Sequence, residues 1–256
     1  MIIVNAFWEK RNLGVDAVTF QIEKGDTLYD IIPLIEENNK EYQTAVVDPT
    51  KPEILLELQN RGFKFIECSL SLSAAADNVK IPEKLKRFQS QMEYRPASSD
   101  EIDMVKEMVR NEGIFKTDKI ALDPFFGVEK SGIRYSFWID DLIKSGNTLF
   151  AITFKNEVIG FEIAKITDGT VDAYLGGMLP CKAGKMLGAA MYVPSTLYWK
   201  EHGAKVINAS VSSNNPPILK IHRSFGLDIV DWKYVLIKHS KQSTRLASTE
   251  TTSRLV

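Results

Sequence analysis

The stretch from residue 170 to residue 238 restricts the possible fold more than any other part of this chain. Its hydrophobic pattern predicts strands over 170–178 and 205–211, with a loop at Pro180 and a helix between them. Asn215 then precedes two prolines, which is typical of a helix start, because asparagine caps a helix and proline suits its first turn. This second helix is expected over 216–225, ahead of Gly226. Strands and helices that alternate in this order indicate a mixed α/β unit.

The composition is typical of a globular protein with a hydrophobic core. The chain has 256 residues, of which 44% are hydrophobic and 25% charged, which suits one large domain or two small ones. A net charge of -1 and the lack of a dense Lys/Arg cluster argue against a nucleic-acid partner. The three histidines show no metal-ligand spacing, so we expect no metal.

Cysteine usage and hydropathy predict where the protein works. Cys68 and Cys181 lie far apart in the sequence, so a reduced setting is expected rather than a disulfide framework. The first residues lack the basic and apolar regions of a signal peptide. No apolar run approaches the ~20 residues that a membrane span needs. We therefore expect a cytoplasmic protein without a membrane span.

The pattern along the chain predicts four segments. Residues 1–75 are expected to form a smaller N-terminal α/β domain, and residues 76–91 a linker with some helical content. Residues 92–239 are expected to form the main domain. Residues 240–256, rich in serine and threonine, are expected to be a polar tail that is mobile or contacts a partner.

Local signals predict several elements of the main domain. Ser98 and Glu101 have the spacing of a capping box, in which each side chain accepts a hydrogen bond from the other residue's backbone N–H. Residues 148–154 and 157–166 predict a hairpin. Pro194 is expected to kink the helix that runs to about His202. Residues 227–239 are expected to form a closing pair of strands.

The loop over 179–189 has the properties of an anion site. Gly184 and Gly188 allow a close approach of backbone to phosphate, and the N–H groups and dipole of the following helix attract negative charge. Lys182 and Lys185 add positive charge nearby. The alternative is a plain junction between a loop and a helix, because the segment is poor in glycine.

These elements and motifs resemble the GNAT acetyltransferases over residues 92–239. The resemblance implies the α/β (α+β) GNAT acyltransferase fold and acetyl-CoA as co-substrate. It implies a coenzyme site made of Met178, Leu179, Pro180, Gly184, Lys185, Met186, Leu187, Gly188, Ala189 and Asn215. Two positions depart from the family pattern: Ala183 stands where Arg or Gln is usual, and Met186 where Gly is usual. Asn215 is equally explained as a helix cap.

Two residues are candidates for catalysis. His222 lies where the family commonly has a tyrosine that protonates the departing thiolate, a thiolate whose pKa should be near ~8.5. An imidazolium with a pKa near ~6.5 would be a permissible acid. Asp172, which alternates with Tyr174 on its strand, is a candidate base. The alternatives are a helix histidine without a role and a polar residue on an exposed strand face.

The N-terminal half adds a second resemblance. The segments 7–14, 118–125 and 135–138 are similar to the family of dTDP-fucosamine acetyltransferases, which acetylate nucleotide-linked amino sugars. This resemblance implies an acceptor side shaped by aromatic residues, for which the candidates are Phe125, Tyr135, Trp138 and Tyr174. Ordinary aromatic core packing explains each of them equally well.

The sequence therefore predicts direct transfer of an acetyl group from acetyl-CoA to the amine of a nucleotide-linked aminodeoxy sugar, with a homodimer as a candidate assembly. One alternative is a GNAT enzyme for another small amine, a peptide or an antibiotic. Another is a GNAT-like scaffold that binds a ligand and catalyses nothing, which Ala183, Met186 and His222 favour.

Overall fold

The computed structural model describes residues 1–180 and 187–240. Its strands belong to one ten-stranded mixed sheet with the order β1-β2-β3-β10-β4-β9-β8-β7-β6-β5. The strands are β1 (Ile2–Asn5), β2 (Ala17–Ile22), β3 (Tyr42–Val47), β4 (Lys64–Ala75), β5 (Met92–Pro96), β6 (Thr148–Phe154), β7 (Glu157–Thr167), β8 (Thr170–Met178), β9 (Val206–Ser212) and β10 (Asp228–His239). The mixed fold class that the sequence predicts is confirmed.

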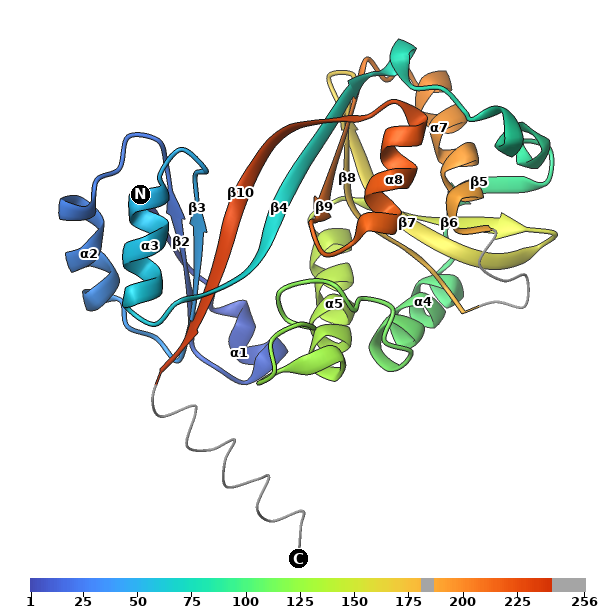
Figure 1. Cartoon of the computed structure of the whole chain (residues 1–256). Coiled ribbons are helices and arrows are strands. Elements are labelled where there is room, and N and C mark those ends of the chain that lie inside the picture. Colours follow the sequence, from blue (N-terminus) through green and yellow to red (C-terminus); the bar gives the residue numbers. More distant parts are fainter. Residues whose placement is uncertain (181–186, 241–256) are drawn as a thin grey trace, which may run out of the picture.

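Helices pack along this sheet (Figure 1). They are α1 (Trp8–Leu13), α2 (Leu28–Glu37), α3 (Pro52–Asn60), α4 (Ser99–Asn111), α5 (Gly127–Lys144), α6 (Leu187–Ala190), α7 (Tyr192–Glu201) and α8 (Pro216–Phe225). Two 3-10 helices, over Ala76–Asn78 and Glu83–Phe88, occupy the expected linker. In the part of the chain that the structure describes, no helix has both the length and the apolar character to cross a bilayer.

Several local predictions are confirmed. Ser98 and Glu101 form the capping box, with Ser98 Oγ accepting from Glu101 N at 3.3 Å and Glu101 Oε2 accepting from Ser98 N at 2.9 Å. β6 and β7 form the expected hairpin. Asn215 caps α8 through its side-chain oxygen, which accepts from Ile218 N at 3.4 Å. Each of these signals depends on residues that are close in sequence.

Two predictions concern the C-terminal half, and the one for its last strands is wrong. The segment expected to form a closing pair contains one strand, β10 (Asp228–His239), because β3 and β4 pair with its two edges. The helix expected to run to His202 is divided into α6 and α7, and Pro194 lies in the first turn of α7. Pro194 has no N–H for the carbonyl of Ala190, and Met191 between the two helices keeps helical dihedral angles, so the break agrees with the interruption that the sequence predicts.

β4 and β10 connect the parts of the sheet (Figure 1). β10 pairs with β3 from Tyr234 to His239 and with β4 from Asp228 to Ile237. Leu236 of β10 lies fully buried in the core that β2, β3, α2 and α3 share. One sheet therefore carries strands from both expected domains, and the division at residues 76–91 stays a prediction.

α5 packs against α4 at a point where only a glycine fits. A Cβ atom at Gly132 would lie 2.6 Å from the carbonyl oxygen of Arg110 and 2.9 Å from that of Val109. Both oxygens belong to the backbone of α4, so they cannot move aside as a flexible side chain can. Gly132 therefore fixes the position of α5 and of the side chains that α5 presents.

We predict that Gly132→Ala lowers the free energy of unfolding by about 1–3 kcal/mol, because the added methyl pushes α5 away from α4. Denaturant unfolding measures the change. The matched control is Gly25→Ala, where an added Cβ meets no atom within 4 Å, and where we expect a change within about 0.5 kcal/mol. Equal effects of the two substitutions would contradict the close packing.

Candidate functional site

The site is built where two parallel strands diverge. β8 and β9 pair from Thr170 opposite Val206 to Ala173 opposite Ala209, and no further pairing follows. On the other side of β8, the register with β7 shifts, so that Tyr174 has no partner between the pairs formed by Ala173 and Leu175. An extra residue of this kind bends a strand. The edge of β8 beyond Ala173 consequently faces β9 without a strand partner.

A cavity of about 710 Å³ fills this divergence. Such a volume is typical of sites for small molecules and cofactors. Its walls come from strands β4 and β6 to β9, from helices α5 to α8, and from the loop over 115–118. The structure brings eight of the predicted site residues to this cavity: Tyr135, Trp138, Tyr174, Met178, Gly188, Ala189, Asn215 and His222.

Other predicted residues lie elsewhere. Asp172 is not among the residues that line the cavity, and its carboxylate accepts a hydrogen bond from Asn208 Nδ2 at 3.1 Å. Phe125 packs beside Phe126 and His239, with ring centroids 5.1 Å and 4.7 Å away. Their predicted roles are untested.

The predicted coenzyme loop is described only in part. Leu179 and Leu187 are buried in the core, and Pro180 is exposed. Gly184, Lys185 and Met186 lie outside the described residues. Gly188 has room, because a Cβ there would meet only the sulfur of Met178, at 3.6 Å. Gly176, Gly177, Gly188 and Ala189 give the cavity small walls, which suit a narrow ligand chain lying against backbone.

His222 faces the cavity from α8 and packs edge-on against Tyr192, with ring centroids 5.0 Å apart. Burial lowers the pKa of His222 to about 4. The ring is therefore neutral near pH 7, with one nitrogen that donates and one that accepts. Burial raises the pKa of Tyr192, so its hydroxyl keeps its proton. This environment disfavours the imidazolium form that the predicted acid role of His222 requires.

Glu67 of β4 contributes a buried carboxyl group to the wall of the cavity. Ser212 Oγ lies 2.5 Å from Glu67 Oε2 and 3.0 Å from the carbonyl oxygen of Thr117. A hydroxyl has one proton, so both contacts are hydrogen bonds at once only when Glu67 is protonated. Burial raises the pKa of Glu67, which agrees with this geometry. The carboxyl group of Glu67 therefore keeps its proton to a higher pH than an exposed glutamate does.

A second carboxyl group, on Glu162 of β7, also reaches the cavity. Burial raises the pKa of Glu162, and Tyr94 Oη donates a hydrogen bond to Glu162 Oε2 at 2.6 Å. Tyr94 itself stacks on Phe150 at 4.4 Å between ring centroids. The carboxyl group of Glu162 is therefore hydrogen-bonded to a buried tyrosine, whereas that of Glu67 is hydrogen-bonded to the hydroxyl of Ser212.

No local pattern in the sequence points to Glu67, Ser212 or Tyr192 as members of one site. Glu67 and Ser212 are 145 residues apart and meet only because β4 lies next to β9. Tyr192 opens α7, where its approach to His222 depends on how α7 and α8 pack. Strand adjacency and helix packing are long-range properties that a local pattern does not encode. Among the described residues, no group of three His, Cys, Asp or Glu side chains is placed to hold a metal ion.

Comparison with known proteins identifies the fold. No family model and no curated protein matches the sequence. A GCN5-related N-acetyltransferase from Sphaerobacter thermophilus superimposes with a TM-score of 0.53 and 11% identity, covering 77% of this chain and 59% of that chain. A functionally unknown conserved protein from Staphylococcus epidermidis gives a TM-score of 0.61 and 12% identity, covering 88% of this chain and 85% of that chain.

A third solved structure contains a fungal GCN5-related glucosamine N-acetyltransferase region within a multi-domain β-N-acetylglucosaminidase. It superimposes with a TM-score of 0.55 and 10% identity, covering 76% of this chain and 25% of that chain. Identities of 10–12% show a shared fold and no more. The chain has the GCN5-related N-acetyltransferase (GNAT) fold, as its sequence predicts.

We predict that His222 makes the protein less stable in acid. The unfolded chain binds a proton at this position near pH ~6.5, whereas the folded chain does so only near pH 4, so stability is lost as pH falls between these values. As the pH falls from about 7.5 to about 5, the contribution of His222 should lower the free energy of unfolding by about 2 kcal/mol.

Denaturant unfolding at the two pH values tests this. His222→Phe should remove that part of the pH dependence, whereas His202→Gln, which changes an exposed ring on another helix end, should retain it. An unchanged pH dependence in His222→Phe would show that burial does not govern this imidazole.

Proposed function

We propose that this protein is an N-acetyltransferase that moves an acetyl group from acetyl-CoA directly to the amine of a nucleotide-linked amino sugar. The divergence of β8 and β9 over a cavity of about 710 Å³ is the observation that carries the proposal. The strand edge left without a partner beyond Ala173 offers backbone N–H groups that can polarise a thioester carbonyl. The small residues that line this wall leave space for the pantetheine arm of the coenzyme.

Glu67 is suited to act as the general base. It lines the cavity, and a carboxylate with a raised pKa can accept a proton from an attacking amine near neutral pH. As the amine nitrogen bonds to the acetyl carbon, its proton passes to Glu67 and the carbon–sulfur bond breaks. We propose Glu67 in this role instead of Asp172, because Asp172 is bonded to Asn208 and lies outside the lining of the cavity.

Tyr192 and His222 are suited to stabilise the departing thiolate. Both line the cavity, and both are neutral groups that can donate a hydrogen bond. A thiol with a pKa near ~8.5 leaves readily as a thiolate, so a hydrogen bond suffices and a full proton transfer is not needed. This role replaces the imidazolium acid that the sequence suggested for His222.

Aromatic side chains support an acceptor of the amino-sugar class. Phe115 stacks on Tyr135 at 4.0 Å between ring centroids, the ring of Trp138 lies 5.7 Å from that of Tyr135, and all three line the same cavity as Glu67. Flat apolar faces beside a carboxyl group suit a sugar ring that carries an amine. The fungal glucosamine N-acetyltransferase region of the same fold, and the resemblance in the N-terminal half, favour the same class.

We predict that isothermal titration calorimetry detects CoA binding with a Kd below about 1 mM. A thiol-release assay should then report turnover with amino-sugar nucleotides. Binding without turnover of any amine would favour a different acceptor class or a scaffold without catalysis. A protein that is folded and does not bind CoA would contradict the proposed function.

A pair of matched substitutions tests the base. We expect Glu67→Gln to lower kcat/KM by about 10²-fold or more and to remove the rise of kcat/KM with pH, because the amide cannot accept the proton. Glu162→Gln keeps a partner for Tyr94 and should change kcat/KM only a few-fold. The reverse ranking would reassign the base to Glu162.

A further inference from the structure

The first cavity has acidic side chains in its wall, and no lysine or arginine among the described residues that line it. Its carboxyl groups belong to Glu67, Asp118 and Glu162. Burial raises the pKa of Glu67 and of Glu162, and a protonated carboxyl group attracts a cation less than a carboxylate does. Lys119, which follows Asp118 in the chain, does not line the cavity, and burial lowers its pKa. Asp118 is therefore the group best suited to bind a cation in this cavity.

Hydrogen bonds hold the carboxyl group of Asp118 in one orientation at the cavity wall. Its Oδ1 accepts from Ala121 N at 2.9 Å and from Ser131 Oγ at 3.0 Å. Ser131 is fully buried on α5, the helix that Gly132 fixes against α4. Both bonds end on Oδ1, which leaves Oδ2 with capacity for a donor from a ligand.

The backbone places Asp118 near Glu67, the proposed base. The carbonyl oxygen of Thr117, the residue before Asp118, lies 3.0 Å from Ser212 Oγ, and the same hydroxyl lies 2.5 Å from Glu67 Oε2. Besides burial, the charge of Asp118 contributes to the raised pKa of Glu67, which agrees with a short separation. An amine that contacts Asp118 is therefore close to the carboxyl group that accepts its proton.

Aromatic rings line the same cavity as Asp118. Phe115 belongs to the same loop, and Tyr135 and Trp138 belong to α5. The face of an aromatic ring attracts a positive charge, and the attraction is stronger where water is excluded. The aromatic wall therefore supports the binding of a cation beside the carboxylate.

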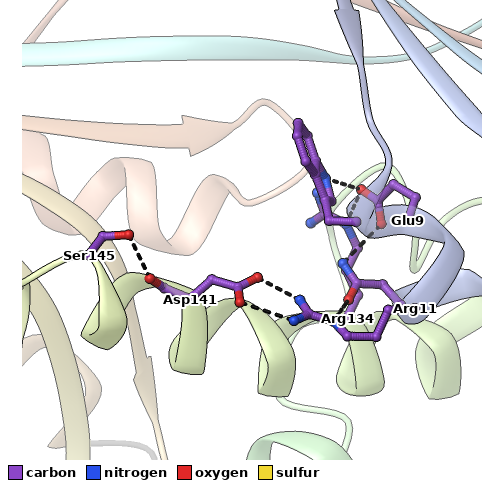
Figure 2. Close-up of polar contacts among 7 residues, drawn as sticks. Glu9, Arg11, Arg134, Asp141 and Ser145 are labelled. Atoms are coloured by element: carbon purple, nitrogen blue, oxygen red, sulfur yellow. Dashed lines mark hydrogen bonds and ion pairs between the residues drawn. The ribbon is translucent and has the colours of Figure 1, made fainter.

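The arginines of α1 and α5 are paired with carboxylates of their own. Arg11 and Arg134 line a second cavity, of about 690 Å³, which lies between these two helices and shares Trp138 with the first. Arg11 binds Asp141 through two hydrogen bonds, of 3.1 Å and 2.5 Å, and Arg134 Nε donates to Glu9 Oε1 at 2.8 Å (Figure 2). Because each guanidinium has a carboxylate beside it, these cations repel a positive ligand in the first cavity only weakly.

We infer that Asp118 binds the ammonium form of the acceptor and so selects amines that have no anionic group beside the nitrogen. The ammonium donates to Asp118 Oδ2 and releases one proton to water before the attack. The neutral amine keeps a hydrogen bond to Asp118, which orients its lone pair, and its second proton passes to Glu67 as the bond to the acetyl carbon forms. An α-amino acid is disfavoured, because its carboxylate would lie against Asp118. The inference rests on the proposed function in one respect: the bound amine is the acceptor of the acetyl group.

NMR titration with glucosamine and with glucose, in the presence of excess CoA, tests the site. The two sugars differ only in an amine that replaces one hydroxyl, and at about pH 6.5 an amine carries its proton. We expect glucosamine to bind at least about tenfold more tightly than glucose, because it forms a charge-assisted hydrogen bond. Equal affinities of the two sugars for the unmodified protein would overturn the inference.

Asp118→Asn provides a second test, since it removes the charge and keeps an oxygen that can accept from Ala121 and Ser131. A folded Asp118→Asn protein, checked by thermal unfolding, should lose the preference for glucosamine. Asp103→Asn, which removes the same charge from an exposed position on α4, is the matched control and should retain the preference. A folded Asp118→Asn protein that still prefers glucosamine would also overturn the inference.

Failure of the inference and failure of the proposed function give different results. Acetylation of an amino-sugar nucleotide with an unchanged KM in Asp118→Asn would reject the ammonium site and retain the enzyme. A preference for glucosamine that depends on Asp118, without acetylation of any amine, would retain the ammonium site and reject the proposed reaction.

Discussion

The pairing of β10 with both β3 and β4 is the interaction on which the rest of this structure depends. β10 lies between these strands, and the order of the sheet makes it the connection between β1–β3 and the strands that line the first cavity. Its residue Val235 lies opposite Glu67, so the same pairing sets the register of the carboxyl group that we propose as the base. Register matters here because a shift of one residue would turn Glu67 to the other face of the sheet.

Local sequence predicted most elements of the fold and part of the site. The Ser98 capping box, the hairpin of β6 and β7 and the Asn215 cap were predictable because each is decided by residues a few positions apart. The strand–loop–helix order likewise indicated a GNAT fold and placed His222 and Met178 at the cavity. What the sequence did not supply was the pairing of distant strands. β10 was expected to fold back on itself, and its real partners lie in the first third of the chain.

The sequence also could not predict the environment of each ionisable group. Glu67 and Glu162 are the same residue type on the same sheet, yet one lies beside a serine hydroxyl and the other beside a buried tyrosine. Burial lowers the pKa of His222 to about 4. The ring is therefore neutral near pH 7 and can donate a hydrogen bond, but it is not the charged acid that the sequence suggested. In the same way Arg134 meets Glu9 across 125 residues of chain, a contact that no local pattern encodes.

The position of β10 also has a consequence for biosynthesis. β3 and β4 leave the ribosome long before residues 228–239, so until then both strands expose unpaired backbone N–H and C=O groups on the edges that β10 will cover. Until β10 has been synthesised, the core formed by β2, β3, α2 and α3 also lacks Leu236. Contacts between such distant segments form slowly, and open strand edges favour aggregation. We therefore expect the first-made part of this chain to be prone to aggregation until β10 has been synthesised.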